Sequence, residues 1–591
     1  MKILGFSGCD GSIRFKRREF SGYSQREYGI AQGFDSAAAL LVNGQIRAAV
    51  AEERFSREKA TGDFPVQAIR YCLDHEGLSP DQVDVVAHGF SYEPYAACFG
   101  ESAYTQRQYE EVFAPEVSKR LIAEAFPGTG LEEKLVNVPH HLSHAASTYY
   151  LSGFEDALVL VSDGMGEIHS MTAYAARGGD FEVLRQVSAL HSLGILYGVF
   201  TLHLGFTMGK DEYKVMGLAP YGNPRKHHQA VVDLVSLKPD GTYAIPLFAS
   251  NRTLEEKETH RGVLAALAER FGPAREPGSE LTQNHMDLAA ALQSAFEKVQ
   301  LHLLRVLQRE TRLKNLCLAG GCALNCTGNG AVRNSKIFAQ MFVQPASGDD
   351  GTSLGAALYV THQREPESLP VERMSVPLWG PHYDQAEVDA ALAGRSDVSG
   401  THYASFDAIA EDVAQRIADG QVVAWYQGRM EFGPRALGSR SILADATSPI
   451  MRDKINRLVK KREGFRPFAP AFKAEAATTY FEIESGDEAT YEHMLFVTRV
   501  RPEYREELPA ITHVNGSARV QTVFRQHSPR LWRLLSAVED KIGVPGVLNT
   551  SFNVRGQPIV CTPAEAIDTF LLANLDVLVM ENTLVAARPQ E

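Results

Sequence analysis

The chain has 591 residues, which is too long for one hydrophobic core, so we expect at least two domains. Its 44% apolar and 22% charged residues are typical of a folded globular protein and exclude a disordered or fibrous chain. A net charge of −13 disfavours nucleic acid as a partner. The sequence contains neither a membrane-spanning run nor a signal-peptide pattern, so we predict no membrane association and a cytoplasmic location.

The first half of the chain contains two similar patterns. A short apolar run at 3–8 ends at a glycine and is followed by a hairpin pattern at 37–50 with an Asn-Gly turn. The same order returns in the apolar run 157–161 and the hairpin pattern 171–184. We therefore predict a duplicated α/β domain with a cleft between its halves.

A long amphipathic helix and a glycine turn follow. Apolar residues recur at three- and four-residue steps over 286–307, which predicts a helix. The strand pattern 316–319 runs into Gly320 and Gly321, with Asn325 shortly after. Backbone N–H groups at such a turn could face the phosphate or ribose of a nucleotide.

A stretch rich in Glu, Pro and Ser at 364–381 lacks apolar periodicity and is typical of a domain linker. We place the boundary near residue 370, with domains at 1–365 and 375–591. Beyond it, strand-like runs alternate with helical patterns, so the second domain is also predicted to be α/β.

Histidines and aspartates suggest a metal site in the first domain. His140 and His144 would share one face of a helix, although such a pair is equally common without a metal. Asp163 follows a buried strand, and Asp349 stands in a Gly-rich loop. Two imidazoles and two carboxylates suit a divalent transition metal such as Fe or Zn.

Cationic residues suggest anion sites. Lys214 lies in a charged loop pattern, where it either is solvated or offsets the charge of a nucleotide phosphate. Arginines between 429 and 466 alternate with apolar residues, so several guanidinium groups should be partly buried, and a buried guanidinium needs an anion. Arg519 and the turn 549–553 could add donors to a bound phosphate or carboxylate.

Seven motifs that cover nearly the whole chain match one family in order. The sequence resembles the O-carbamoyltransferases of natural-product and antibiotic biosynthesis, which include the tobramycin, cephamycin, novobiocin and nodulation-factor enzymes. The motifs are Ala51-Glu52-Glu53-Arg54-Phe55, His140-x-x-x-His144, Asp163-Gly164-x-Gly166-Glu167, Lys214-Val215-Met216-Gly217-Leu218-Ala219, Gly433-Pro434-Arg435-Ala436-Leu437-Gly438, Arg466-Pro467-Phe468-Ala469-Pro470 and Leu548-Asn549-Thr550-Ser551-Phe552-Asn553.

The resemblance implies an N-terminal duplicated actin-like ATPase (ASKHA) domain, similar to the tRNA threonylcarbamoyl-transfer protein, and a C-terminal YrdC-like α/β domain. It implies that the first domain binds Fe(II), or alternatively Zn or Mn. It further implies metal ligands at His140, His144, Asp163 and Asp349, and contacts with carbamoyl phosphate and nucleotide in the second domain at Arg435, Arg462, Arg466, Arg519, Asn549 and Ser551. From the residues themselves we predict a nucleotide site in the first domain at Lys214, Gly320, Gly321 and Asn325. We further predict catalytic roles for Asp35, Lys214, Arg519 and Ser551.

The function implied is ATP-dependent carbamoyl transfer. Carbamoyl phosphate and ATP, with Mg, would form carbamoyl-adenylate, and the carbamoyl group would pass to a hydroxyl of a small natural product. A small-molecule kinase of the actin-like fold and a non-catalytic nucleotide-binding scaffold are the alternatives. The sequence leaves open whether the chain forms an oligomer. One departure is Phe34, which stands where relatives carry a histidine before Asp35.

Overall fold

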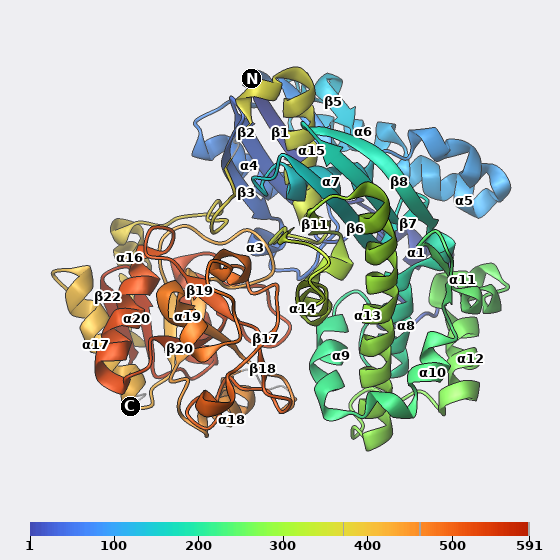
Figure 1. Ribbon diagram of the computed structural model, residues 1–591. Coiled ribbons are helices and arrows are strands. Elements are labelled where there is room, and N and C mark those ends of the chain that lie inside the picture. The colour runs from blue at the N-terminus through green and yellow to red at the C-terminus, as the bar shows by residue number, and fades with distance from the viewer. Residues whose placement is uncertain (370–371, 460–462, 589–591) are drawn as a thin grey trace. The chain divides into compact units, whose positions relative to one another are not determined.

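The computed structural model describes residues 1–369, 372–459 and 463–588 (Figure 1). The chain forms two compact units. The first contains residues 1–53 and 60–374, and the second contains residues 54–59 and 375–591. The segment Arg54–Lys59, which the sequence placed in the first domain, thus packs in the second unit. The domain limits of 1–365 and 375–591 remain a prediction.

Two five-stranded sheets form the centre of the first unit, in the orders β3-β2-β1-β4-β5 and β12-β11-β6-β7-β8. Their strands are β1 (Lys2–Phe6), β2 (Ala37–Val42), β3 (Gln45–Ala51), β4 (Val85–His88) and β5 (Leu135–Asn137), then β6 (Asp156–Gly166), β7 (His169–Arg177), β8 (Asp180–Ser188), β11 (Asn315–Ala319) and β12 (Gln340–Val343).

The two sheets have the same topology. Strand β1 pairs antiparallel with β2 and parallel with β4, and β6 pairs in the same way with β7 and β11. The outer pairs also correspond: β2–β3 and β7–β8 are antiparallel, whereas β4–β5 and β11–β12 are parallel. The predicted duplication is therefore confirmed, and this repeated α/β sheet is the architecture of the actin-like ATPase class.

Two buried helices lie between the sheets. Helix α15 (Asp350–Arg364) packs on β1 and β2, α7 (His140–Tyr149) packs on β6 and β11, and the two helices pack against each other (Figure 1). This close packing requires glycine, because a Cβ atom at Gly355 would lie 1.8 Å from the carbonyl oxygen of Ser143. The layers bring the N-terminal ends of both helices to the end of β6.

The other helices of the first unit cover the outer faces of the sheets or extend beyond them. The predicted helix at 286–307 is α13 (Gln283–Thr311), the long helix seen in Figure 1. The others are α1 (Ser12–Glu19), α2 (Gln25–Tyr28), α4 (Val66–His75), α5 (Ala103–Gln108), α6 (Pro115–Ala125), α8 (Leu193–His203), α9 (Glu212–Leu218), α10 (His228–Val232), α11 (Leu254–Thr259), α12 (Arg261–Phe271) and α14 (Cys326–Asn334). The short helix α3 (Glu53–Ser56) begins in this unit, but its residues from Arg54 on belong to the second.

The second unit is built on a mixed eight-stranded sheet in the order β13-β22-β21-β14-β15-β20-β16-β19. The strands are β13 (Val398–His402), β14 (Val423–Tyr426), β15 (Arg440–Ala444), β16 (Ala469–Lys473), β19 (Gln521–Val523), β20 (Gly546–Ser551), β21 (Val577–Met580) and β22 (Thr583–Ala587). A two-stranded ribbon, β17 (Thr498–Arg499) and β18 (Ser517–Ala518), stands apart from it.

Helices α17 (Phe406–Ala418) and α20 (Pro529–Ile542) pack against each other and bury their apolar faces with Trp425 and its neighbours in one core. Helices α16 (Gln385–Leu392), α18 (Met451–Lys454), α19 (Ala474–Tyr480) and α21 (Pro563–Leu572) complete the unit. The prediction of an α/β second domain is confirmed, while its YrdC-like character remains a prediction. Among the described residues, no helix has the length and apolar character that crossing a membrane requires.

Candidate functional site

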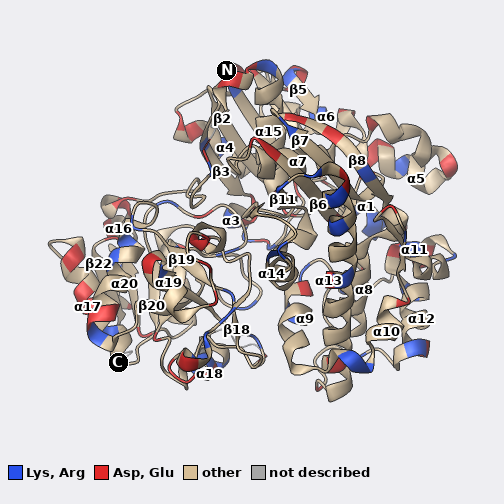
Figure 2. Ribbon diagram, viewed as in Figure 1, with Lys and Arg blue, Asp and Glu red and all other residues tan. Residues whose placement is uncertain are grey.

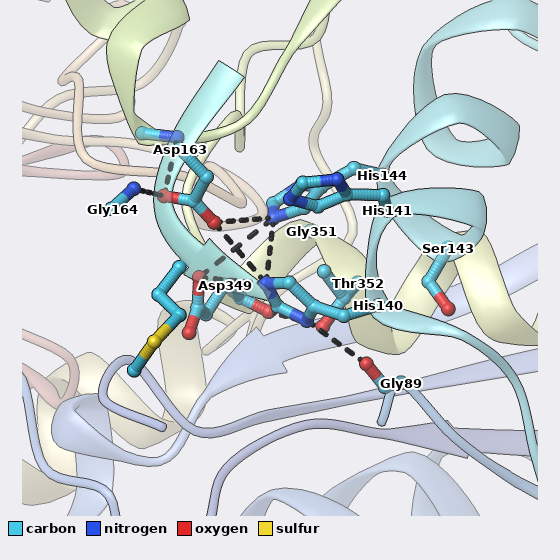
Figure 3. Close-up of polar contacts among 12 residues, drawn as sticks. Gly89, His140, His141, Ser143, His144, Asp163, Gly164, Asp349, Gly351 and Thr352 are labelled. Carbon is cyan, nitrogen blue, oxygen red and sulfur yellow. Dashed lines mark hydrogen bonds and ion pairs between the residues drawn. The ribbon is translucent and has the colours of Figure 1, made fainter. Parts of the chain in front are cut away.

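A polar cluster occupies the meeting point of α7, β6 and α15 (Figure 3). His140, His144, Asp163 and Asp349 each direct one ligand atom into it, and these four atoms lie within 4.8 Å of one another. The Nε2 atoms of the two histidines are 3.2 Å apart, and Nε2 of His140 lies 3.2 Å from Oδ2 of Asp163 and 3.4 Å from Oδ1 of Asp349. The structure thus brings together all four predicted metal ligands from three separate segments.

The backbone fixes Asp163. Its Oδ1 atom accepts the N–H groups of Gly164 at 2.7 Å and of Gly321 at 3.2 Å, which leaves Oδ2 directed at the histidines. The sequence pattern predicts that Asp163 follows the strand, but Asp163 still belongs to β6, where an irregular register between Ser162 and Gly166 interrupts the pairing with β7. Such an irregularity can turn a side chain out of the sheet toward a site.

The ring of His140 is held on both sides. Its Nδ1 atom lies 3.0 Å from the carbonyl oxygen of Gly89, a partner that requires a proton on Nδ1, so Nε2 is the nitrogen that carries a lone pair when the ring is neutral. Phe90 stacks on the imidazole at 4.1 Å between ring centroids. The ring therefore presents Nε2 to the cluster in the tautomer that a metal ligand needs.

His140 and the two aspartates of the cluster shift one another's pKa values. Burial disfavours a charged imidazole, but the carboxylates of Asp349 and Asp163 outweigh burial and raise the pKa of His140 well above its ordinary value. Conversely, hydrogen bonds from His140 and His144 outweigh burial and hold the pKa of Asp163 well below its usual range. The cluster thus contains two carboxylate charges that require a cation, either a proton on histidine or a metal ion.

The donor set fits a divalent metal. Ligand bonds of about 2.0–2.2 Å place neighbouring ligand atoms roughly 3.0–3.5 Å apart, close to the 3.2 Å between the histidine nitrogens and the 3.2 and 3.3 Å from each to Asp163. Mixed imidazole and carboxylate ligands suit Fe, Zn or Mn. Metal binding and the identity of the metal remain predictions.

Two further acidic residues adjoin the cluster. Glu167, the last residue of the motif that begins at Asp163, accepts the N–H of His140 at 2.8 Å and that of Ser91 at 2.9 Å, and so caps α7. No role was predicted for it. Asp35 has a left-handed backbone with φ of 54°, and its Oδ2 atom would lie 3.6 Å from a Cβ atom built at Gly348. The predicted catalytic Asp35 therefore lies beside the segment that carries Asp349.

The prediction of a loop around Lys214 is wrong, because the residue lies within α9. The helix directs its buried ammonium group to Asp211, 2.8 Å away, and toward the ring of Phe206. Lys214 is consequently not a solvated lysine, and its role toward a nucleotide remains a prediction.

The glycine turn is engaged with protein atoms. Gly321 donates to Asp163, as above, and Gly320 has a φ of 86° and approaches the carbonyl oxygen of Ser162 so closely that a Cβ atom would lie 2.3 Å from it. The side chain of Asn325 accepts the N–H of Gly328 at the start of α14 and exchanges hydrogen bonds with Gln293. Nucleotide binding by these residues remains a prediction.

Glu212 is the first residue of α9, the helix that carries Lys214. Burial raises the pKa of its carboxyl group from 4.5 to about 7. Between these values the folded state holds a proton that the unfolded state has lost, so stability falls as the pH rises through this window. Replacing Glu212 with glutamine keeps an acceptor for the N–H of Gly209. We expect this variant to be more stable than the parent at pH 8, by up to about 3 kcal/mol, and only slightly more stable at pH 5, near the lower end of the window.

Thermal melting of both proteins at the two pH values checks this expectation. An equal difference in melting temperature at pH 5 and pH 8 would contradict the assignment of the shifted carboxyl to Glu212.

In the second unit, the loop 433–438 that carries Arg435 is anchored at several points. The carbonyl oxygens of Ala436 and Leu437 accept from Asn549 at 3.3 Å and Gln521 at 2.7 Å. The carboxylate of Glu431 accepts three backbone N–H groups, those of Leu437, Ser439 and Arg440. The loop is therefore preorganised, and sequence reasoning missed the residues Glu431 and Gln521 that hold it.

Arg519 is a half-buried arginine between β18 and β19, where Figure 2 shows basic residues beside β18. Its guanidinium makes no hydrogen bond or ion pair with any residue that the structure describes. Arg466 lies 3.7 Å from the carboxylate of Glu463. Arg462 was predicted to contact the ligand but lies outside the described residues.

Strand β20 carries the other two predicted contacts. Asn549 is buried and donates to Gln521 at 2.9 Å, while its Oδ1 atom has no hydrogen-bond partner within the described part of the chain. Ser551 donates to Asn553 at 2.9 Å. Since Asn549 pairs with Ala469 of β16 and bonds Gln521 of β19, the segments that carry Arg435, Arg466 and Arg519 adjoin this strand.

The expectation that a buried guanidinium needs an anion is wrong for Arg440. This residue is fully buried, yet its guanidinium donates to the carbonyl oxygens of Gln427, Gly428, Ser439 and Pro381. It also lies 3.6 Å from the ring centre of Tyr426. Backbone oxygens and an aromatic face thus replace the anion.

The fold and the site define the class of protein: an actin-like unit with a histidine–aspartate cluster, combined with an α/β unit that carries an anchored arginine loop. The family model described as carbamoyltransferase N-terminus matches residues 26–358, and the model described as carbamoyltransferase C-terminus matches residues 414–587. The chain belongs to the carbamoyltransferase family, which makes it a transferase of carbamoyl groups that acts on small-molecule acceptors.

Relatives match over most of the chain. An uncharacterized protein of Synechocystis sp. is 39% identical over 94% of this chain and 96% of its own length. The nodulation protein NolNO of Sinorhizobium fredii is 40% identical over 94% of this chain and 79% of its own. The crystal structure of HypF from T. kodakarensis is 14% identical in sequence and matches 63% of this chain and 49% of the HypF chain. Its TM-score of 0.29 is too low to support a conclusion.

Proposed function

We propose that the protein is an ATP-dependent O-carbamoyltransferase that activates the carbamoyl group in the second unit and transfers it in the first. The observation that carries this proposal is that two chemically different groups of residues lie in separate units. The second unit contains Arg519, a cation with no described partner, and the anchored loop of Arg435, which together suit anionic phosphates. The first contains the histidine–aspartate cluster.

Activation in the second unit requires charge neutralisation. Carbamoyl phosphate loses its phosphate to water, which gives carbamate and inorganic phosphate. A carbamate oxygen then attacks the α-phosphorus of ATP, and the bond to pyrophosphate breaks, so that carbamoyl-adenylate forms. Arg435, Arg466 and Arg519 would hold the phosphates and offset their charge, which lets two anions approach each other. Buried Asn549 offers an acceptor, Oδ1, for an N–H or O–H group of the bound molecules.

Transfer in the first unit requires a base and an electrophile. The acceptor hydroxyl attacks the carbamoyl carbon, its proton passes to a base, and AMP leaves. Asp35, beside the segment of Asp349, is the candidate base, with His169 as the alternative. A divalent ion held by His140, His144, Asp163 and Asp349 would polarise a carbonyl or bind a phosphate oxygen. The acceptor is proposed to be a small hydroxylated natural product.

Nucleotide products separate this proposal from a kinase and from a scaffold. The protein, ATP, Mg, carbamoyl phosphate and a library of hydroxylated metabolites should yield AMP and pyrophosphate together with a metabolite whose mass increases by one carbamoyl group. ADP with a phosphorylated metabolite would instead identify a kinase, and unchanged ATP would identify a scaffold; either result contradicts the proposal.

A further inference from the structure

The segment Arg54–Lys59 interrupts the first unit in sequence and belongs to the second unit. Its flanking residues, Glu53 and Ala60, belong to the first unit and are joined by a hydrogen bond of 2.7 Å from the N–H of Ala60 to the carboxylate of Glu53. The segment itself belongs to the second unit, where Phe55 packs against Met430 and Ile559. Six residues from the N-terminal part of the sequence therefore complete the second unit.

Two arginines fasten this segment by different contacts. Arg54 is 4% exposed and donates from Nη2 to the carbonyl oxygen of Gly433, 3.0 Å away. Arg57 donates to the carbonyl oxygens of Ile559 and Pro558 at 2.8 and 3.1 Å and pairs with Glu565 at 3.2 Å. Only the first arginine touches the loop that carries Arg435.

The contact of Arg54 falls at the start of the loop, next to a backbone hydrogen bond of 2.8 Å from the N–H of Phe432 to the carbonyl oxygen of Pro377. Asn549, Gln521 and Glu431 hold residues that follow Arg435, whereas Gly433 precedes it by two positions. Gly433 also has a φ of 118°, a conformation that favours glycine and gives the chain its bend before Pro434. A hydrogen bond from a charged donor to a buried carbonyl oxygen is among the stronger ones in proteins.

We propose that Arg54 is a positioning residue of the activation site, which fixes the entry of the loop and thereby the place of Arg435. This inference rests on the proposed function of the second unit. Without Arg54, the carbonyl oxygen of Gly433 loses a buried donor, so the loop shifts to find another partner. Because a displacement of about 1 Å at a binding group can reduce a rate a hundredfold, the effect should appear in the use of carbamoyl phosphate.

The test compares variants of the full-length chain in carbamoyl-phosphate-dependent release of pyrophosphate from ATP. Replacing Arg54 with alanine should lower kcat/KM for carbamoyl phosphate about tenfold to a hundredfold. Replacing it with lysine, which can still donate to Gly433, should recover part of this loss. Arg57→Ala, from the same segment, should behave like the parent.

Melting temperatures accompany the kinetics. If Arg54→Ala fails to fold, Arg54→Lys carries the test, with a smaller loss expected at an unchanged melting temperature. Equal activity of the Arg54 and Arg57 variants, or a loss of activity that follows a lowered melting temperature in every Arg54 variant, would overturn the positioning role. Arg435→Ala serves as the reference: if it leaves pyrophosphate release intact, the proposed function of the loop fails instead.

Discussion

Replacing Arg519 with alanine should abolish the formation of carbamoyl-adenylate. Its half-buried guanidinium has no hydrogen-bond or ion-pair partner among the described residues, so it is available to a bound anion. The loss of one charge-assisted contact to a buried anion costs on the order of 2–5 kcal/mol, which corresponds to a rate lower by a factor of roughly thirty to several thousand. Pyrophosphate release from ATP in the presence of carbamoyl phosphate measures this step.

Arg533→Ala is a matched control for this experiment. Arg533 lies on α20 of the same unit and pairs with Asp407 and Glu411, both of which have partly exposed side chains. Because exposed ion pairs contribute little, this variant should keep full activity. If both arginine variants release pyrophosphate at the rate of the parent, Arg519 does not bind the anion that is activated.

Replacing His140 with alanine should remove the bound metal and stop transfer to the acceptor, while pyrophosphate release continues. The imidazole contributes one of four ligand atoms and contacts both carboxylates of the cluster. Loss of one ligand leaves two buried carboxylates with a single histidine, so the site should lose affinity for a divalent ion. Metal analysis of the purified proteins and mass spectrometry of the acceptor measure the two effects.

His362→Ala is the control here. His362 lies in the last turn of α15, the helix whose other end begins next to Asp349, and it packs against the ring of Tyr150. Its removal should leave the metal content unchanged. Equal metal content in the His140 variant, the control and the parent would refute the metal assignment.

Local signals explain which parts of the fold were predictable. The Asn-Gly turn lies between β2 and β3, and the apolar spacing of 286–307 fixed the position of α13, because both depend on neighbours in sequence. The placement of His140 and His144 on one helical face was predictable for the same reason. In contrast, Asp163 and Asp349 join them only through the packing of α7, α15 and β6. The chemistry of the four side chains and the family resemblance suggested this set of ligands, but no local pattern predicted their convergence.

Sequence reasoning erred or was silent where contacts between distant segments determine the surroundings of a residue. Arg440 has the buried setting of an anion-binding arginine, but its charge is offset by carbonyl oxygens that no sequence pattern reveals. Arg54 lies three residues after the end of β3, yet its partner Gly433 lies 379 positions away. Lys214 was expected in a loop because charged residues precede it, although the apolar residues after it form the buried side of α9. A local pattern cannot identify such partners.

The central claim is that activation and transfer occur in different units. It is tested most directly by measuring pyrophosphate release and acceptor carbamoylation separately, in the same preparations of Arg519→Ala and His140→Ala. We expect Arg519→Ala to lose both, and His140→Ala to release pyrophosphate at close to the rate of the parent while forming no carbamoylated product. If His140→Ala stops pyrophosphate release as completely as Arg519→Ala does, the histidine–aspartate cluster takes part in activation, and the division between the units is wrong.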